Sequence, residues 1–194
     1  AKMINGEGWL ANGKKCDLTV IKTVNYTHKS FYELPIKPSP NLPNMASVYL
    51  YPSLCLFEGT TISVGRGTDK PFQILGHPLI KSDKYSFTPK PTGGAKKPKL
   101  NGKKCNGYDL SSFGDSYIKN KPSLNLFWLI DIYNNYPNKD EFFIKSFNRL
   151  AGTDKLQQQI KDGVSEQEIY KSWQEGLTQF KQIRKKYLLY PDFE

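Results

Sequence analysis

The run Phe57-Glu58-Gly59-Thr60-Thr61-Ile62-Ser63-Val64-Gly65-Arg66-Gly67-Thr68 combines one carboxylate, four hydroxyls and one guanidinium with three glycines. That mixture is typical of neither a helix nor a strand. Glycine lets the backbone turn and approach a ligand closely, and arginine offers a planar fork of donors that fits a carboxylate or phosphate. The run therefore predicts a polar loop that holds an anionic or hydroxyl-rich small molecule. A plain solvated turn, with the arginine paired to a nearby acid, is the alternative.

The absence of several well-known motifs from the sequence argues against several kinds of site. The run is neither a P-loop nor a dinucleotide-binding glycine fingerprint. His28 and His77 have no second histidine at helical spacing, no serine lies in a nucleophile elbow, and no C-x-x-C pair occurs, so neither a hydrolytic triad nor a metal site is expected. Paired carboxylates remain, because Glu7, Glu58 and Asp69 lie in glycine-rich polar contexts and a glycosidase needs two such groups.

Composition points to a globular protein with a basic surface. The 194 residues carry a net charge of +10, are 38% hydrophobic and 13% aromatic, and can form one large domain or two small ones. Much of the positive charge lies in residues 90–104, for which a solvated loop and a nucleic-acid surface are both considered. Aromatic residues do not interleave with the lysines there, so nucleic-acid binding ranks last. The basic cluster at Arg184-Lys185-Lys186 complements a helix dipole.

The chain divides into two parts of different character. Residues 1 to about 120 are rich in glycine, proline and short β-type runs, whereas residues 121–190 are mostly helical. Strand–loop–strand–helix order in the first part favours an α/β sheet, with the glycine run at a helix end. Pro52 suits the first turn of a helix over residues 53–57. The expected strands cover residues 17–23, 47–51, 72–75, 85–89, 107–110 and 116–118.

The second part contains clearer helices. Hydrophobic spacing predicts helices over residues 123–136 and 140–150, followed by a short helix that Thr153 caps and that ends at Gly163. Ser165 and Glu168 form a capping box at the start of a long helix. Its apolar stripe is expected to be core: Ile169, Trp173, Leu177, Phe180, Ile183 and Tyr187.

Three features bear on where the protein works. No apolar run of about 18 residues occurs, so no transmembrane helix is expected. The three cysteines, Cys16, Cys55 and Cys105, leave at least one free thiol and do not decide the compartment. The start Ala1-Lys2-Met3 lacks an initiator methionine and is expected to be an internal start.

Several further segments combine with the opening run into one specific pattern. They are Met3-Ile4-Asn5-Gly6-Glu7-Gly8-Trp9-Leu10, Leu18-Thr19-Val20-Ile21, Pro38-Ser39-Pro40-Asn41-Leu42-Pro43, Tyr51-Pro52, Pro71-Phe72-Gln73, Gly107-Tyr108-Asp109-Leu110, Ala151-Gly152 and residues 187–193. On this pattern the chain resembles the exo-β-N-acetylmuramidase family (NamZ-type), formerly a domain of unknown function, over essentially its whole length.

The resemblance implies a fold that runs from α/β to α+β. Residues 1–70 would be the C-terminal end of a Rossmann-like half, and residues 71–194 a mixed α+β domain that is helical from about residue 121. The presumed catalytic glutamate of the family would then lie in the half upstream of Ala1, and this chain would pack against that half. Within the chain, Glu58 is the catalytic candidate.

The resemblance also implies a function in bacterial cell-wall recycling. Such enzymes remove N-acetylmuramic acid from the non-reducing ends of peptidoglycan fragments, in the periplasm or outside the cell, without a metal or another cofactor. Arg66 would grip the lactyl carboxylate, while Trp9 or Tyr51 would stack on the sugar ring. A non-catalytic peptidoglycan-binding module is the alternative. The remaining residues expected to bind the substrate are Thr60, Ser63, Thr68, Asn41 and Glu7.

Overall fold

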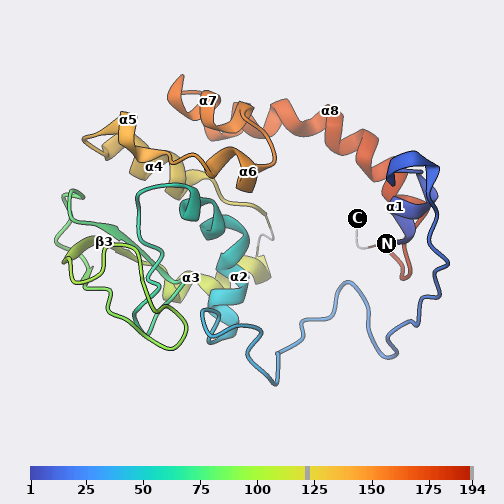
Figure 1. The fold of residues 1–194 in the computed structure, drawn as a ribbon, viewed down its shortest axis with the longest axis horizontal. Helices are drawn as coiled ribbons and strands as arrows, with labels where there is room; N and C mark the ends of the chain where they lie inside the picture. Colours follow the sequence, from blue (N-terminus) through green and yellow to red (C-terminus); the bar gives the residue numbers. More distant parts are fainter. Residues whose placement is uncertain (121–122, 193–194) are drawn as a thin grey trace. The chain divides into compact units, whose positions relative to one another are not determined.

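The computed structural model describes residues 1–120 and 123–192 and divides the chain into two compact units (Figure 1). Unit 1 combines the two ends of the chain, Ala1–Tyr32 and Tyr170–Glu194, and unit 2 is the continuous segment Glu33–Ile169. The predicted boundary at residue 70 lies inside unit 2, and the assignment of residues 1–70 to a Rossmann-like half stays a prediction. The predicted start of the helical part, at about residue 121, falls on residues 121–122, outside the described chain.

Unit 2 has a mixed α+β architecture, as the sequence predicts. It begins with α2 (Met45–Leu54) and the 3₁₀ turn η2 (Cys55–Gly59), and a small sheet with four short helices and α3 follows. The helix α2 packs against α3, and α6 packs against η2. The remaining elements are β1 (Ile74–His77), β2 (Ser86–Phe87), β3 (Cys105–Asp109), α3 (Ser111–Asn120), α4 (Phe127–Asn135), α5 (Lys139–Phe142), α6 (Phe147–Ala151) and α7 (Lys155–Lys161).

The sheet of unit 2 is antiparallel, with β3 between β1 and β2. Ile74 faces Asp109 and Gly76 faces Gly107 across the first pair. A side chain at Gly107 would run into the carbonyl of Leu75, so only glycine allows this close approach. The strands predicted over residues 72–75, 85–89 and 107–110 are thus confirmed to within a few residues.

Two strand predictions in the first half are wrong. Residues 17–23 form no regular structure, and Ile21 is 92% exposed, because β-branched residues favour a strand only where a neighbouring strand and a buried face are present. Residues 47–51 belong to α2 instead. Asn44 caps that helix by accepting a hydrogen bond from the Ser47 amide at 3.0 Å, and the Ser47 hydroxyl in turn accepts one from the Asn44 amide at 3.4 Å. Pro52 lies inside α2 rather than at the start of a new helix.

One more strand prediction is wrong, and one predicted helix is broken in two. Residues 116–118 lie in α3, and the helix predicted over residues 140–150 is two short helices, α5 and α6. The chain between them pairs with the loop after η2 through a bridge between Thr60 and Phe143, which an unbroken helix could not form. Unit 2 has a buried core to which that loop contributes, because Thr60 and Ile62 are 0% exposed. Its largest fully buried side chains include Phe57, Phe142, Phe147, Leu50, Leu54 and Leu129.

Unit 1 contains α1 (Lys2–Gly6), the 3₁₀ turn η1 (Ala11–Gly13) and most of α8 (Glu166–Lys185). The predicted capping box of α8 is confirmed, because Ser165 and Glu168 exchange hydrogen bonds at 3.1 and 3.3 Å. The predicted apolar stripe is only partly core. Ile169 is fully buried, whereas Leu177 and Phe180 are 43% and 41% exposed.

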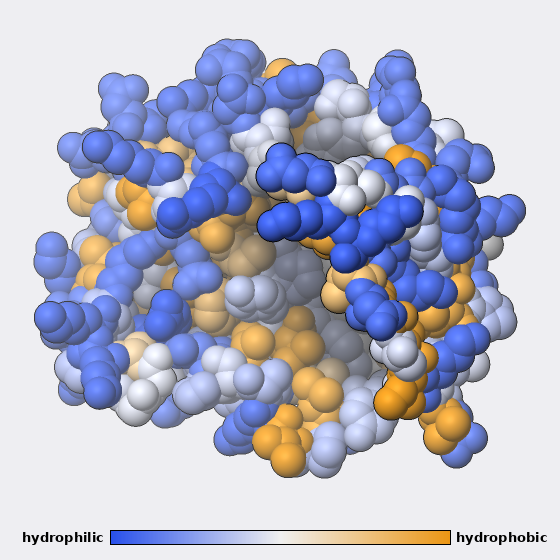
Figure 2. All heavy atoms as spheres, turned by 45° about the vertical axis from the view of Figure 1, so that its right-hand side comes forward, coloured by the Kyte–Doolittle hydropathy of each residue, from blue (hydrophilic) through white to orange (hydrophobic). Residues whose placement is uncertain are grey.

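The face of the molecule drawn in Figure 2 is mostly hydrophilic. Hydrophobic side chains lie between the hydrophilic ones. No helix in the described ranges is both long and apolar enough to cross a membrane.

Candidate functional site

The predicted polar loop is held by backbone hydrogen bonds on both sides. On one side Thr61 donates to the Phe142 carbonyl and Ile144 donates to the Gly59 carbonyl, both at 2.9 Å. On the other side Ser63 and Gly76 exchange two hydrogen bonds, at 2.9 and 3.0 Å. The segment therefore behaves as an added strand between β1 and the chain before α6, which makes it a rigid support for the side chains it carries.

Two glycines set the backbone on each side of Arg66. Gly65 and Gly67 have φ angles of 74° and 85°, which residues with a side chain rarely adopt. A Cβ at Gly65 would also run into Ile74, and one at Gly67 would meet the Lys90 carbonyl at 2.5 Å. The sequence pattern Gly-Arg-Gly thus reflects a required backbone path that presents one arginine at a fixed place.

Arg66 forms an ion pair with Glu58. Its Nη1 lies 3.2 Å from Glu58 Oε1, and the two side chains are 43% and 29% exposed. The Arg66 Nε is buried and has no hydrogen-bond partner among the described residues. A ligand therefore reaches this guanidinium at its outer nitrogens, one of which already faces Glu58.

A cavity of about 290 Å³ opens beside this ion pair. Its charged lining comprises Glu58, Arg66, Lys97 and Lys99, and Ser63 and Val64 complete one wall. Three cations against one carboxylate leave the cavity with an excess of positive charge. The arrangement complements a small ligand that carries an anionic group.

Lys99 is a functional candidate that the sequence prediction missed. Its ammonium donates to the Thr60 carbonyl, to the Ile62 carbonyl at 3.1 Å and, more distantly, to the Phe57 carbonyl at 3.4 Å. The pKa of Lys99 is lowered to about 8, mainly by burial; the nearby Glu58 opposes this shift and Arg66 adds to it. The interpretation of residues 90–104 as a solvated loop is therefore wrong at this position.

Tyr51 lies on α2 near the same site. Its ring contacts Phe72 with ring centroids 4.9 Å apart, and the side chain is partly exposed. Burial raises the pKa of Tyr51, and the nearby Cys55 and Glu58 add to that rise. The role of Tyr51 in stacking on a sugar ring remains a prediction, and its ring already contacts Phe72 at a tilt of 60°.

The hydroxyls predicted to bind substrate are engaged in turns of the loop. Thr60 donates to the Phe57 carbonyl at 2.8 Å, and Thr68 donates to the Gly65 carbonyl at 2.7 Å. Ser63 accepts from the Gly65 amide at 3.2 Å and also lines the cavity. Asn41 donates to the Gly94 carbonyl at 2.8 Å. Among these four residues, Ser63 is the one that lines the cavity.

Glu7 and Trp9 belong to unit 1. Glu7 accepts a hydrogen bond from the Tyr187 hydroxyl at 2.7 Å and pairs with Lys186 at 2.5 Å, and both contacts lower the pKa of Glu7. Trp9 is half exposed. Their predicted contact with substrate stays a prediction.

The described residues offer no cluster of three or more histidine, cysteine, aspartate or glutamate side chains that could bind a metal ion. Cys16, Cys55 and Cys105 are free thiols. Burial raises the pKa of Cys105 to about 11, so that thiol stays protonated and unreactive.

The fold and site together define a two-unit α+β protein with a positively charged cavity of about 290 Å³ in unit 2. The family described as "Exo-beta-N-acetylmuramidase NamZ, C-terminal" matches residues 49–190. The chain is 37% identical to the peptidoglycan beta-N-acetylmuramidase NamZ of Bacillus subtilis (strain 168), over 90% of this chain and 46% of that protein. The chain therefore belongs to the NamZ family.

Two solved structures share this fold. A DUF1343 family protein of Bacteroides fragilis NCTC 9343 is 50% identical, with a TM-score of 0.92 over 98% of this chain and 54% of that one. A second DUF1343 family protein of the same strain is 20% identical, with a TM-score of 0.73 over 97% of this chain and 54% of that one, and it supports the fold alone. The chain spans about half the length of these relatives.

Proposed function

We propose that this chain is the C-terminal half of a peptidoglycan-processing exo-glycosidase that releases N-acetylmuramic acid from non-reducing ends. Family membership and the name of the Bacillus subtilis relative support the reaction class. The main catalytic acid then lies in the upstream half, against which this chain packs, and the enzyme works in the cell envelope, in the periplasm or outside the cell.

The observation that carries the proposal is the cationic cavity beside Arg66. Its excess positive charge suits the lactyl carboxylate that distinguishes muramic acid from other amino sugars. Because Nε is buried and Nη1 faces Glu58, the carboxylate binds at the outer edge of the guanidinium. Glu58 then acts as the resident counter-ion that orients Arg66, rather than as the catalytic acid.

The test compares two chromogenic substrates in the full-length protein. Arg66→Ala should lower kcat/KM for a chromogenic N-acetylmuramide by about 10- to 100-fold, because a charge-assisted hydrogen bond contributes roughly 1.5–3 kcal/mol. The corresponding N-acetylglucosaminide lacks the lactyl carboxylate, so any residual turnover of it should be unaffected. Arg149→Ala, an exposed arginine on α6, is the matched control.

An equal loss for both substrates would contradict the assignment of Arg66 to the lactyl group. An intact protein that binds insoluble cell wall but releases no muramic acid would instead favour a non-catalytic binding module.

A further inference from the structure

A second cavity in unit 2 lies apart from the charged residues of the first. It has a volume of about 280 Å³, and the chain before β2, the end of β3, the start of α3 and the helix α4 form its walls. None of the residues that line the first cavity lines this one. Five aromatic rings line it: Tyr85, Tyr108, Phe113, Phe127 and Trp128.

The aromatic wall is unusually open to solvent. Phe127 is 56% exposed and Phe113 is 48% exposed, although both belong to the lining of a concave site. Phe113 and Trp128 meet edge to face with centroids 6.1 Å apart, which fixes the two rings against each other. Exposed rings grouped in a cavity mark a binding surface more than a structural core.

A polar pair forms the other part of the cavity. The Tyr108 hydroxyl lies 3.5 Å from Asp131 Oδ2, a separation too long for a good O–H···O hydrogen bond. Asn135 donates to Asp131 Oδ1 at 3.2 Å and so orients the carboxylate. Burial and the neighbouring Asp131 raise the pKa of Tyr108, which keeps its hydroxyl neutral and able to donate. A ligand hydroxyl can therefore join both groups.

The charges around the cavity balance. Lys70 pairs with Asp109 at 2.5 Å, and Ser111 also donates to Asp109, so that carboxylate is already satisfied. Lys84 offsets Asp131 on the remaining lining. Unlike the first cavity, this one has no net charge to favour an anion or a cation. Aromatic faces beside a hydroxyl donor and a carboxylate acceptor fit the apolar face and the hydroxyls of an uncharged sugar ring.

We propose that the cavity between β3 and α4 is a saccharide subsite that binds an uncharged sugar ring, with Phe127 and Trp128 against its apolar face and Tyr108 and Asp131 on its hydroxyls. The existence of the site rests on this geometry alone. The inference that the bound sugar ring belongs to a glycan rests on the proposed function.

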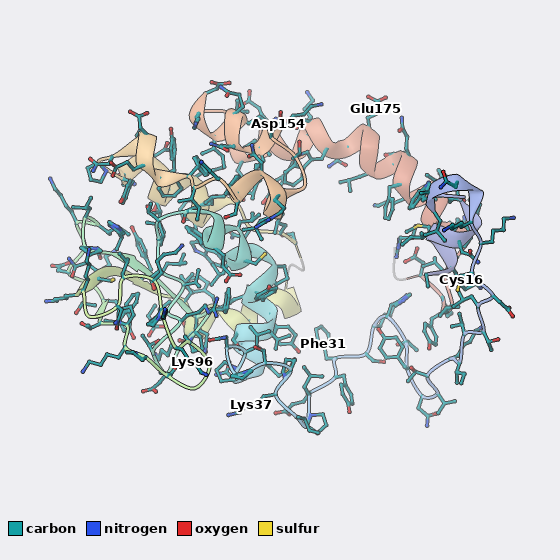
Figure 3. The ribbon with its side chains drawn as sticks, viewed as in Figure 1. Cys16, Phe31, Lys37, Lys96, Asp154 and Glu175 are labelled. Carbon is teal, nitrogen blue, oxygen red and sulfur yellow. The ribbon has the colours of Figure 1, made fainter. Side chains whose placement is uncertain are left out.

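Calorimetric titration of the full-length protein with an uncharged N-acetylglucosamine tetramer tests the proposal. Phe127→Ala and Tyr108→Phe should each weaken binding by about three- to tenfold, because one removes an exposed ring and the other a single hydroxyl. Phe31→Ala is the matched control, since Phe31 is a similarly exposed phenylalanine of unit 1 (Figure 3) and should leave the affinity unchanged.

Arg66→Ala separates this subsite from the proposed catalytic function. It should leave binding of the uncharged tetramer intact even while it impairs turnover of the muramide. The proposal would be overturned if the wild-type protein did not bind the tetramer, or if the Phe127→Ala and Tyr108→Phe variants bound it as tightly as the wild type does. Displacement of the tetramer by a simple alkylamine would also overturn it. Failure of the muramide assay alone would leave the subsite standing.

Discussion

Replacing Lys99 with methionine removes the ammonium shared by the Thr60, Ile62 and Phe57 carbonyls and keeps an unbranched side chain in the same space. At neutral pH two effects oppose each other. The Thr60 and Ile62 carbonyls lose their donor, at roughly 1–3 kcal/mol each. The variant also avoids burying a charge, whose cost corresponds to a pKa that falls from 10.5 to about 8, or about 3 kcal/mol. Stability at one pH therefore cannot separate them.

The pH dependence can. Because the pKa of Lys99 is lower in the folded protein than in the unfolded chain, the unfolded chain binds more protons between pH 8 and 10.5. The stability contributed by this lysine is complete above the unfolded pKa and is lost as the pH falls through about 8. Between about pH 7.5 and about pH 9.5 the wild-type protein should gain about 2 kcal/mol relative to Lys99→Met.

Urea unfolding at these two pH values measures the difference. Replacing Trp9 and Trp173 with phenylalanine in all variants leaves Trp128 as the fluorescent reporter of unit 2. Lys96→Met is the control, because Lys96 lies on the same loop and is exposed (Figure 3), and it should show no such difference. A difference that stays constant or shrinks as the pH rises would refute the argument from burial.

Two further substitutions test the frame of the site. Gly65→Ala should destabilise unit 2 by about 2–4 kcal/mol, because it combines a strained backbone with a clash against Ile74; Gly102→Ala has a similar φ and open space and should cost only about 1 kcal/mol in thermal unfolding, so equal losses would contradict the clash. Asn44→Ala should cost about 1 kcal/mol in urea unfolding through loss of the α2 cap, whereas Asn44→Asp keeps a side-chain acceptor for Ser47 and should cost less; equal losses would remove the cap as the cause.

Much of the fold could be predicted from local signals. The capping box at Ser165 depends on two side chains three residues apart, so the sequence contains the whole interaction. The Gly-Arg-Gly pattern likewise reports a local backbone requirement, which the positive φ of Gly65 and Gly67 confirms. Features of this kind can be predicted from the sequence because the local backbone already requires them, and distant contacts such as the Lys90 carbonyl beside Gly67 only add to that requirement.

Other features depend on partners far along the chain. Residues 47–51 have strand-like composition, yet the cap at Asn44 and packing of α2 on α3 make them helical. Lys99 becomes a buried donor only because the chain brings it to carbonyls about forty residues earlier. A lysine in a basic loop carries no local sign of that contact, which is why the sequence prediction assigned it to solvent.

Lys99 and Glu58 also explain why Arg66 can serve as a ligand group. An arginine among cations would swing toward solvent unless something held it, and the Glu58 carboxylate at 3.2 Å supplies that hold. The Phe57 and Ile62 carbonyls, which accept from Lys99, directly precede Glu58 and Ser63 in the chain. The lysine therefore fixes the loop from which Glu58 and Ser63 project. In the proposed site, Arg66 would contact the anion and Lys99 would hold the backbone of the loop. Replacement of Lys99 should then displace the Arg66 side chain although Arg66 itself is unchanged. The effects of substitutions at the two positions should therefore be coupled rather than additive.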